Sequence, residues 1–141
     1  MHPFVKWAGG KTQLLDKLVA LMPKEYNHYF EPFIGGGALL FHVAPNEFTI
    51  NDFNSELVQA YRCLSNPSDT EKLIERLKFH QKNHSEEHYY EVRSMDKSPD
   101  FLSLPIYERA ARMIYLNKSC FNGLYRVNSK GFFNVPSGKK K

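Results

Sequence analysis

The chain has 141 residues, 42% of them hydrophobic, and a formal net charge of +4. No run approaches the ~18 apolar residues that a membrane span needs, and the N-terminus lacks the apolar segment of a secretory signal. The two cysteines, Cys63 and Cys120, fit no disulfide or metal-ligand spacing. These features exclude membrane and disulfide-rich secreted proteins, and we expect a single-domain-sized protein of the cytoplasm.

The charge is unevenly distributed. Residues 101–141 contain eight Lys and Arg against one Glu, a net charge of +7, so residues 1–100 sum to −3. This asymmetry favours a polyanionic partner for the C-terminal part. A solvated basic surface explains the charge equally well.

The first third of the chain alternates helices and strands. Its order of strand, glycine turn, helix, strand and acidic residue is typical of the opening of a parallel, doubly wound sheet. We predict a helix over 11–22 that Pro23 ends, a strand over 28–34, a turn at 35–37, a helix over 38–43, and a strand over 48–50 followed by Asn51-Asp52.

The rest of the chain changes character. Apolar residues recur at helical spacing over 55–64, 70–80, 86–95 and 106–116, and a loop rich in Asn and Gly follows over 117–138. The pattern predicts a helical insertion after the second strand rather than further alternating strands.

Gly35, Gly37 and Asp52 form the first candidate ligand site. Glycines after a buried strand let backbone amides approach a ligand, and an acid after the next strand can accept hydrogen bonds from ribose hydroxyls. Leu40 occupies the position of the third glycine of G-x-G-x-x-G, which argues against a nicotinamide cofactor. A nucleoside without a pyrophosphate, such as S-adenosylmethionine, remains. An ordinary glycine turn with a helix-capping Asp is the alternative.

Trp7 precedes Gly9-Gly10-Lys11-Thr12, a run that superficially resembles a phosphate-binding loop. That loop requires a glycine where Val5 stands, so we reject this interpretation. Trp7 and Lys11 either line a pocket for an adenosyl or carboxylate group or belong to a core contact and a capping turn.

The segment 117–138 predicts a hairpin, because Asn122-Gly123 and Lys130-Gly131 are turn dipeptides. Arg126 could contact a guanine edge, and the ring of Phe121 could stack or wedge against a base. A surface hairpin with ordinary aromatic packing is the alternative.

Three histidines, His80, His84 and His88, fall at the spacing of one helix face, as zinc ligands can. Their neighbours are polar, so we expect a solvated face and no metal. Tyr89-Tyr90 is expected to pack a helix.

Four segments together resemble the Dam-type DNA adenine methyltransferases: FVKWAGGKTQLL, FEPFIGGGALLF, INDFNSELV and RAARMIYLNKSCFNGLYRVNSKGFFNVPSG. The resemblance implies an α/β fold, with an incomplete Rossmann-like methyltransferase domain over 1–54, a helical target-recognition domain with a DNA-reading hairpin over 55–138, and a truncated basic end at 139–141. It implies S-adenosylmethionine as methyl donor, without a metal, and double-stranded DNA as partner.

The resemblance also assigns residues. It implies that the cofactor contacts are Trp7, Lys11, Phe33, Gly35, Gly37 and Asp52. It implies that the DNA contacts, several of them reading a GATC-like site, are Lys6, Phe121, Asn122, Leu124, Arg126 and Pro136.

The chain departs from the family pattern at one place. These enzymes carry Asp-Pro-Pro-Tyr or a close variant after the recognition domain, and no Pro-Pro pair occurs here. We therefore expect a monomeric N-terminal fragment of an adenine-specific methyltransferase, inactive by itself and without catalytic residues of its own.

Two other functions remain open, a truncated DNA- or cofactor-binding module and a different Rossmann-like enzyme that prefers a dinucleotide. Whether the enzyme acts alone or beside a cognate restriction endonuclease is also open.

Overall fold

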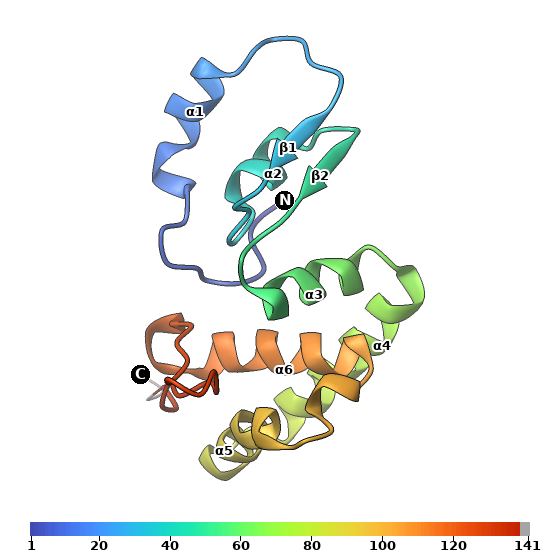
Figure 1. Cartoon of the computed structure of the whole chain (residues 1–141), viewed down its shortest axis with the longest axis vertical. Coiled ribbons are helices and arrows are strands. Elements are labelled where there is room, and N and C mark those ends of the chain that lie inside the picture. Colours follow the sequence, from blue (N-terminus) through green and yellow to red (C-terminus); the bar gives the residue numbers. More distant parts are fainter. Residues whose placement is uncertain (139–141) are drawn as a thin grey trace. The chain divides into compact units, whose positions relative to one another are not determined.

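The structure, a computed structural model, describes residues 1–138, so the basic end at 139–141 lies outside the described residues. The chain divides into two compact units, Met1–Asn54 and the residues from Ser55 onward. Figure 1 shows a small sheet with α1 and α2 in the first unit and a group of helices in the second.

The first unit contains the predicted strand–turn–helix–strand order. Strands β1 (Tyr29–Glu31) and β2 (Phe48–Ile50) pair in parallel, and helix α2 (Ala38–Val43) connects them. β1 is shorter than predicted because Pro32 has no N–H to donate to the ladder. Two residues after Pro32, the Ile34 N–H again donates to the neighbouring segment, to the Asn51 carbonyl at 2.9 Å. The two strands therefore end side by side.

The N-terminal helix is also shorter than predicted. It consists of a 3-10 turn at Thr12–Leu14 and helix α1 (Leu15–Leu21), which packs against α2. No residue of α1 is buried, and Leu21 is 83% exposed. On the sheet, Phe30 is 69% exposed, so part of the apolar surface of this unit lies open.

The second unit is built around α6 (Ile106–Ser119), which packs against α3 (Ser55–Leu64), α4 (Pro67–Lys82) and α5 (Glu86–Ser94). All residues of α6 from Ala110 to Asn117 are buried. α4 begins earlier than predicted, because the Asn66 side chain accepts a hydrogen bond from the Asp69 N–H at its N-terminus, where Pro67 is favoured. α6 continues past the predicted end, into the segment expected to be loop.

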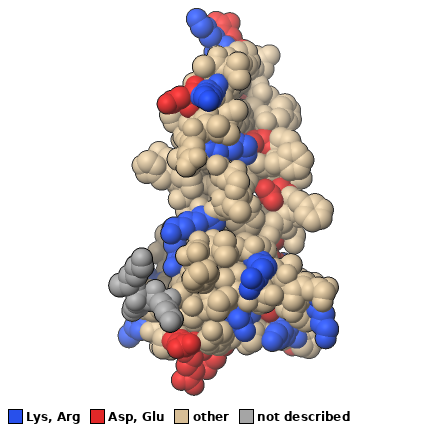
Figure 2. Space-filling view, turned by 90° about the vertical axis from the view of Figure 1, so that its left-hand side faces the viewer, with Lys and Arg blue, Asp and Glu red and all other residues tan. Residues whose placement is uncertain are grey.

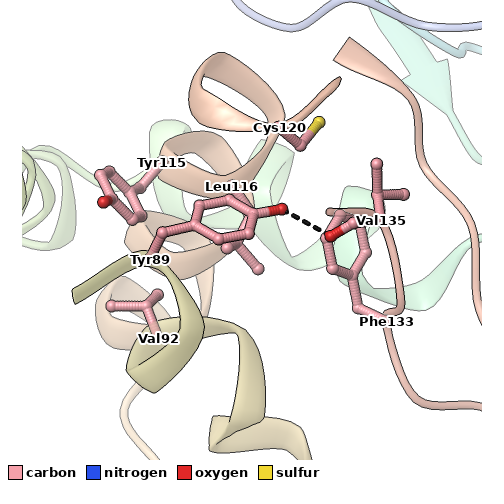
Figure 3. Close-up of a cluster of buried hydrophobic side chains, with 7 residues drawn as sticks. All are labelled: Tyr89, Val92, Tyr115, Leu116, Cys120, Phe133 and Val135. Atoms are coloured by element: carbon pink, nitrogen blue, oxygen red, sulfur yellow. Dashed lines mark hydrogen bonds between the residues drawn. The ribbon is translucent and has the colours of Figure 1, made fainter. Parts of the chain in front are cut away.

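A cluster of buried side chains joins α5, α6 and the C-terminal segment (Figure 3): Tyr89, Val92, Tyr115, Leu116, Cys120, Phe133 and Val135. The Tyr89 hydroxyl donates to the Val135 carbonyl at 2.8 Å. Burial raises the pKa of this hydroxyl. The expected packing role of Tyr89 is confirmed.

The expectation of a solvated histidine face is wrong. α4 ends at Lys82, so the three histidines do not continue along one helix. His80 is 2% exposed, its Nδ1 lies 3.0 Å from His88 Nε2, and its ring stacks on Tyr115. His84 Nδ1 lies 2.8 Å from the Tyr115 hydroxyl. The histidines belong to the contact between α4, α5 and α6.

No helix within residues 1–138 has the length and apolar character needed to cross a membrane. In the same part of the chain, no group of three or more His, Cys, Asp or Glu side chains gathers in a geometry that could hold a metal ion.

Candidate cofactor site and hairpin

A hollow of about 290 Å³ lies in the first unit where the chain leaves the carboxyl ends of β1 and β2. All of the residues expected to contact the cofactor line it: Trp7, Lys11, Phe33, Gly35, Gly37 and Asp52. They come from three separate segments of sequence. The fold therefore brings the expected cofactor residues together.

A larger hollow of about 420 Å³ lies at the opposite, amino ends of the strands, lined by residues 24–27 and 43–47. None of the expected cofactor residues lines it. In open α/β sheets, ligands bind outside the carboxyl ends of the strands. The smaller hollow is therefore the better candidate.

Gly35 allows the glycine turn to lie directly against Trp7. It has a positive φ of 54°, and a Cβ at this position would come within 3.1 Å of Trp7 Cδ1. Gly36 is also close, since its Cβ would lie 3.3 Å from the Val5 carbonyl oxygen. Both the positive φ and the close approach to Trp7 favour glycine at position 35.

Asp52 connects the two strand ends. Its Oδ2 accepts a hydrogen bond from the Gly35 N–H at 3.0 Å, and its Oδ1 accepts one from the Asn54 N–H at 3.0 Å. A carboxylate offers about four lone-pair positions, so each oxygen can accept a further bond from a ligand hydroxyl. The capping interpretation and the ribose interpretation are therefore compatible with each other.

Lys11 is held by a buried acid that sequence reasoning did not single out as a site residue. Its Nζ donates to Glu31 Oε1 at 3.1 Å and to the Phe33 carbonyl at 2.7 Å. Glu31 is 6% exposed, and its Oε2 accepts a 2.6 Å bond from the Tyr29 hydroxyl. Burial, followed by the bond and charge of Glu31, raises the pKa of Tyr29. The sequence signal was a lone acid within an apolar strand.

These features fit a nucleoside cofactor with an amino-acid tail. The glycines leave room for close backbone approach, Asp52 can accept bonds from ribose hydroxyls, and Lys11 has one donor left for a carboxylate. The Trp7 ring and the 73% exposed Phe33 provide apolar and π surfaces.

The C-terminal segment forms the predicted hairpin. Asn122 and Gly123 both have positive φ, as in a type I′ turn, and the Leu124 N–H donates to the Phe121 carbonyl. At the tip, Asn128 Oδ1 accepts bonds from the N–H groups of Lys130 and Phe132. An antiparallel bridge between Val127 and Phe133 joins the two arms.

The residues expected to contact DNA are all exposed, but they lie in different units. Lys6 belongs to the first unit, and the others belong to the hairpin: Phe121, Asn122, Leu124, Arg126 and Pro136. The Arg126 side chain is bonded to the same hairpin, since its Nε donates to Asn134 Oδ1 at 2.8 Å. The hairpin thus presents two cations, Arg126 and Lys130, and several apolar groups to the solvent.

Positive charge does not form one continuous patch on the face shown in Figure 2. Lys and Arg side chains are spread there among uncharged ones. Positive charge spread in this way offers a polyanion general attraction rather than one defined site.

Comparison with known proteins agrees with this geometry. Residues 7–141 match the family model described as D12 class N6 adenine-specific DNA methyltransferase. The whole chain is 52% identical to part of a Type II methyltransferase of Lactococcus lactis subsp. cremoris and 42% identical to part of one of Methanocaldococcus jannaschii. Over 98% of its length, it is 35% identical to a DNA adenine methylase of Escherichia coli K12.

The matches cover 49%, 53% and 48% of these three relatives, so the chain spans about half of their length. The family model, in contrast, covers nearly the whole chain. The chain therefore belongs to the D12 class N6 adenine-specific DNA methyltransferase family.

Proposed function

We propose that this chain is the cofactor- and DNA-binding part of an adenine-specific DNA methyltransferase. The enzyme would transfer a methyl group from S-adenosylmethionine to the exocyclic amine of adenine in duplex DNA. The observation that carries the proposal is that all six expected cofactor residues line one hollow at the carboxyl ends of β1 and β2. The chain that carries this hollow belongs to the adenine-specific methyltransferase family.

The first unit would be the start of a Rossmann-like domain that binds the cofactor. Asp52 would accept the ribose hydroxyls, Lys11 would bind the carboxylate, and Gly35 and Gly37 would admit the methionine moiety beside Phe33. Trp7 would line the pocket with its ring. The support is the position of these groups around one hollow.

The second unit would be the target-recognition insertion, with the hairpin contacting DNA at a GATC-like site. The Arg126 guanidinium would donate to a guanine edge, and Phe121 and Leu124 would contact bases through apolar surface. Asn122, Pro136 and, from the first unit, Lys6 would provide the other contacts. The exposure of all these side chains supports this assignment.

Methyl transfer would need a group that these 141 residues do not contain. The adenine amine is a weak nucleophile, because its lone pair is delocalised into the ring. An enzyme must flip the base out of the helix and accept hydrogen bonds from the amine as positive charge develops. The family's Asp-Pro-Pro-Tyr segment would supply those acceptors, and no Pro-Pro pair occurs in this sequence.

Two of the named relatives are Type II methyltransferases, which suggests a restriction-modification role. In that role the enzyme would protect DNA against a cognate restriction endonuclease. The DNA adenine methylases among the relatives leave a solitary role as the alternative.

A methyl-transfer assay tests the proposal with two samples. The first is the 141-residue chain, and the second is the chain joined to the remaining half of the Lactococcus relative. With labelled S-adenosylmethionine and a GATC duplex, we expect label at adenine N6 only in the joined protein. Label transferred by the chain alone would contradict the need for an external loop. A folded, cofactor-binding joined protein that labels no adenine would contradict the function.

A further inference from the structure

Arg126 and Asn134 face each other across the hairpin. Arg126 Nε donates to Asn134 Oδ1 at 2.8 Å, and Arg126 Nη2 lies 3.4 Å from the Asn134 carbonyl oxygen. In return, the Asn134 N–H donates to the Arg126 carbonyl at 3.0 Å. The side chain and the backbone of Asn134 therefore both hold Arg126.

These bonds leave the outer edge of the guanidinium available. Arg carries five N–H donors in a planar fork, and Asn134 engages the Nε side of it. Donors on Nη1 and Nη2 remain after these bonds are counted, and Arg126 is exposed. Two parallel donors are what a guanine edge accepts through its O6 and N7 atoms.

Asn134 can fix this orientation because its own strand is anchored. Its two neighbours, Phe133 and Val135, are 4% and 1% exposed. Asp96 Oδ2 accepts a bond from the Phe133 N–H at 2.7 Å, and the Tyr89 hydroxyl donates to the Val135 carbonyl (Figure 3). Asn134 is thus a half-buried residue between two buried anchors.

The anchor at Asp96 is itself held. Arg112, 3% exposed, places its Nη2 2.9 Å from Asp96 Oδ2. The same guanidinium donates to the carbonyls of Val92 and Arg93 at the end of α5. A continuous set of contacts therefore runs from the buried helices to Asn134 and so to the exposed Arg126.

We propose that Asn134 is a positioning residue for sequence recognition, which sets the guanidinium of Arg126 so that its outer edge meets one base pair. This inference rests on the proposed DNA-reading role of Arg126. A free arginine side chain loses much rotational freedom on binding, and holding it in advance reduces that loss. Asn134 therefore acts on discrimination through Arg126.

Fluorescence anisotropy of the 141-residue chain tests this, with a GATC duplex and duplexes changed at one base pair at a time. Arg126→Ala should reduce discrimination at one base pair by roughly 5- to 100-fold. Asn134→Ala should reduce discrimination at the same base pair by about 3- to 10-fold. The double variant should discriminate no worse than Arg126→Ala alone, because the second change acts through the first.

Two further variants separate positioning from loosening of the hairpin. Asn134→Asp keeps an acceptor for Arg126 Nε and should retain more discrimination than Asn134→Ala. Asn128→Ala removes an amide from the same hairpin without touching Arg126 and should leave discrimination unchanged. Circular dichroism melting confirms that each variant is folded.

The outcomes separate the positioning role of Asn134 from the reading role of Arg126. If Arg126→Ala loses discrimination and Asn134→Ala keeps it, the positioning role is wrong and the reading role stands. Equal losses in Asn134→Ala and Asn128→Ala, or additive losses in the double variant, also contradict positioning. If the native chain shows no preference for any duplex, or if Arg126→Ala leaves every preference unchanged, the reading role of Arg126 and the positioning role of Asn134 are both wrong.

Discussion

The Asp52 carboxylate, which follows β2, accepts a hydrogen bond from the backbone N–H of Gly35, which follows β1, at 3.0 Å. The bond joins two segments that line the candidate cofactor hollow. An acid expected to bind the ribose therefore also shapes the turn on which the rest of the ligand would lie.

Replacing Asp52 tests this double role. Asp52→Ala should lower S-adenosylmethionine affinity by roughly 10- to 100-fold, since it removes both the ligand acceptor and the support of the turn. It should change DNA affinity little, because the hairpin belongs to the other unit. Glu47→Ala, which removes an acid from the larger hollow, is the matched control. Calorimetric titration with S-adenosylmethionine and with DNA measures both affinities. Equal losses of the two affinities in Asp52→Ala would indicate misfolding instead.

Gly35→Ala tests the close approach to Trp7. The change should lower the free energy of unfolding by about 1–2 kcal/mol through the positive φ, and more through the 3.1 Å contact with the Trp7 ring. Gly131→Ala has a similar positive φ of 82° with nothing within 4 Å of the added Cβ. Urea unfolding of the two variants should show the larger loss for Gly35→Ala. Equal losses would mean that the Trp7 contact yields easily.

Sequence periodicity predicted most helices, because α2, α3, α5 and α6 carry clear apolar residues. The apolar strand β2 was predicted in the same way, from its position just before Asn51-Asp52. The end of β1 was missed because Pro32 interrupts the ladder inside an otherwise apolar run, and one further bond, from Ile34 to Asn51, follows it. Glu31 was overlooked because its role depends on Lys11 and Tyr29, which are close only in the fold. His80 was placed in solvent because local polarity outweighed a contact made by Tyr115, 35 residues away in sequence.

The buried pair of Arg112 and Asp96 should be important for stability. Burial lowers the pKa of the Arg112 guanidinium, while the neighbouring Asp96 charge and hydrogen bond raise it. Arg112→Met should lower the free energy of unfolding by about 3–5 kcal/mol, because it leaves a buried carboxylate without its partner. Adding Asp96→Asn should restore part of that loss. Denaturant unfolding that gives a simple sum of the two single effects would contradict coupling of the pair.

His80 should make the second unit sensitive to acid. Burial, with smaller effects of Arg76 and His88, lowers its pKa from 6.5 to about 4. Below pH 6.5 the unfolded chain binds a proton that the folded chain does not, so the free energy of unfolding falls as the pH decreases towards 4. The total loss should be roughly 3 kcal/mol.

Thermal melting between pH 7.5 and 4 measures this effect. His80→Phe keeps a ring against Tyr115 and should show a shallower dependence of melting temperature on pH. His42→Phe, at an exposed position of α2, should keep the native dependence. Identical slopes for the native chain and His80→Phe would show that His80 titrates normally.

The most direct test of the account is equilibrium dialysis of the 141-residue chain against labelled S-adenosylmethionine. We predict saturable binding of one molecule per chain, displaced by S-adenosylhomocysteine and not by nicotinamide adenine dinucleotide. A folded chain that binds no S-adenosylmethionine, or that prefers the dinucleotide, would contradict the assignment of the cofactor site to the hollow at the carboxyl ends of β1 and β2.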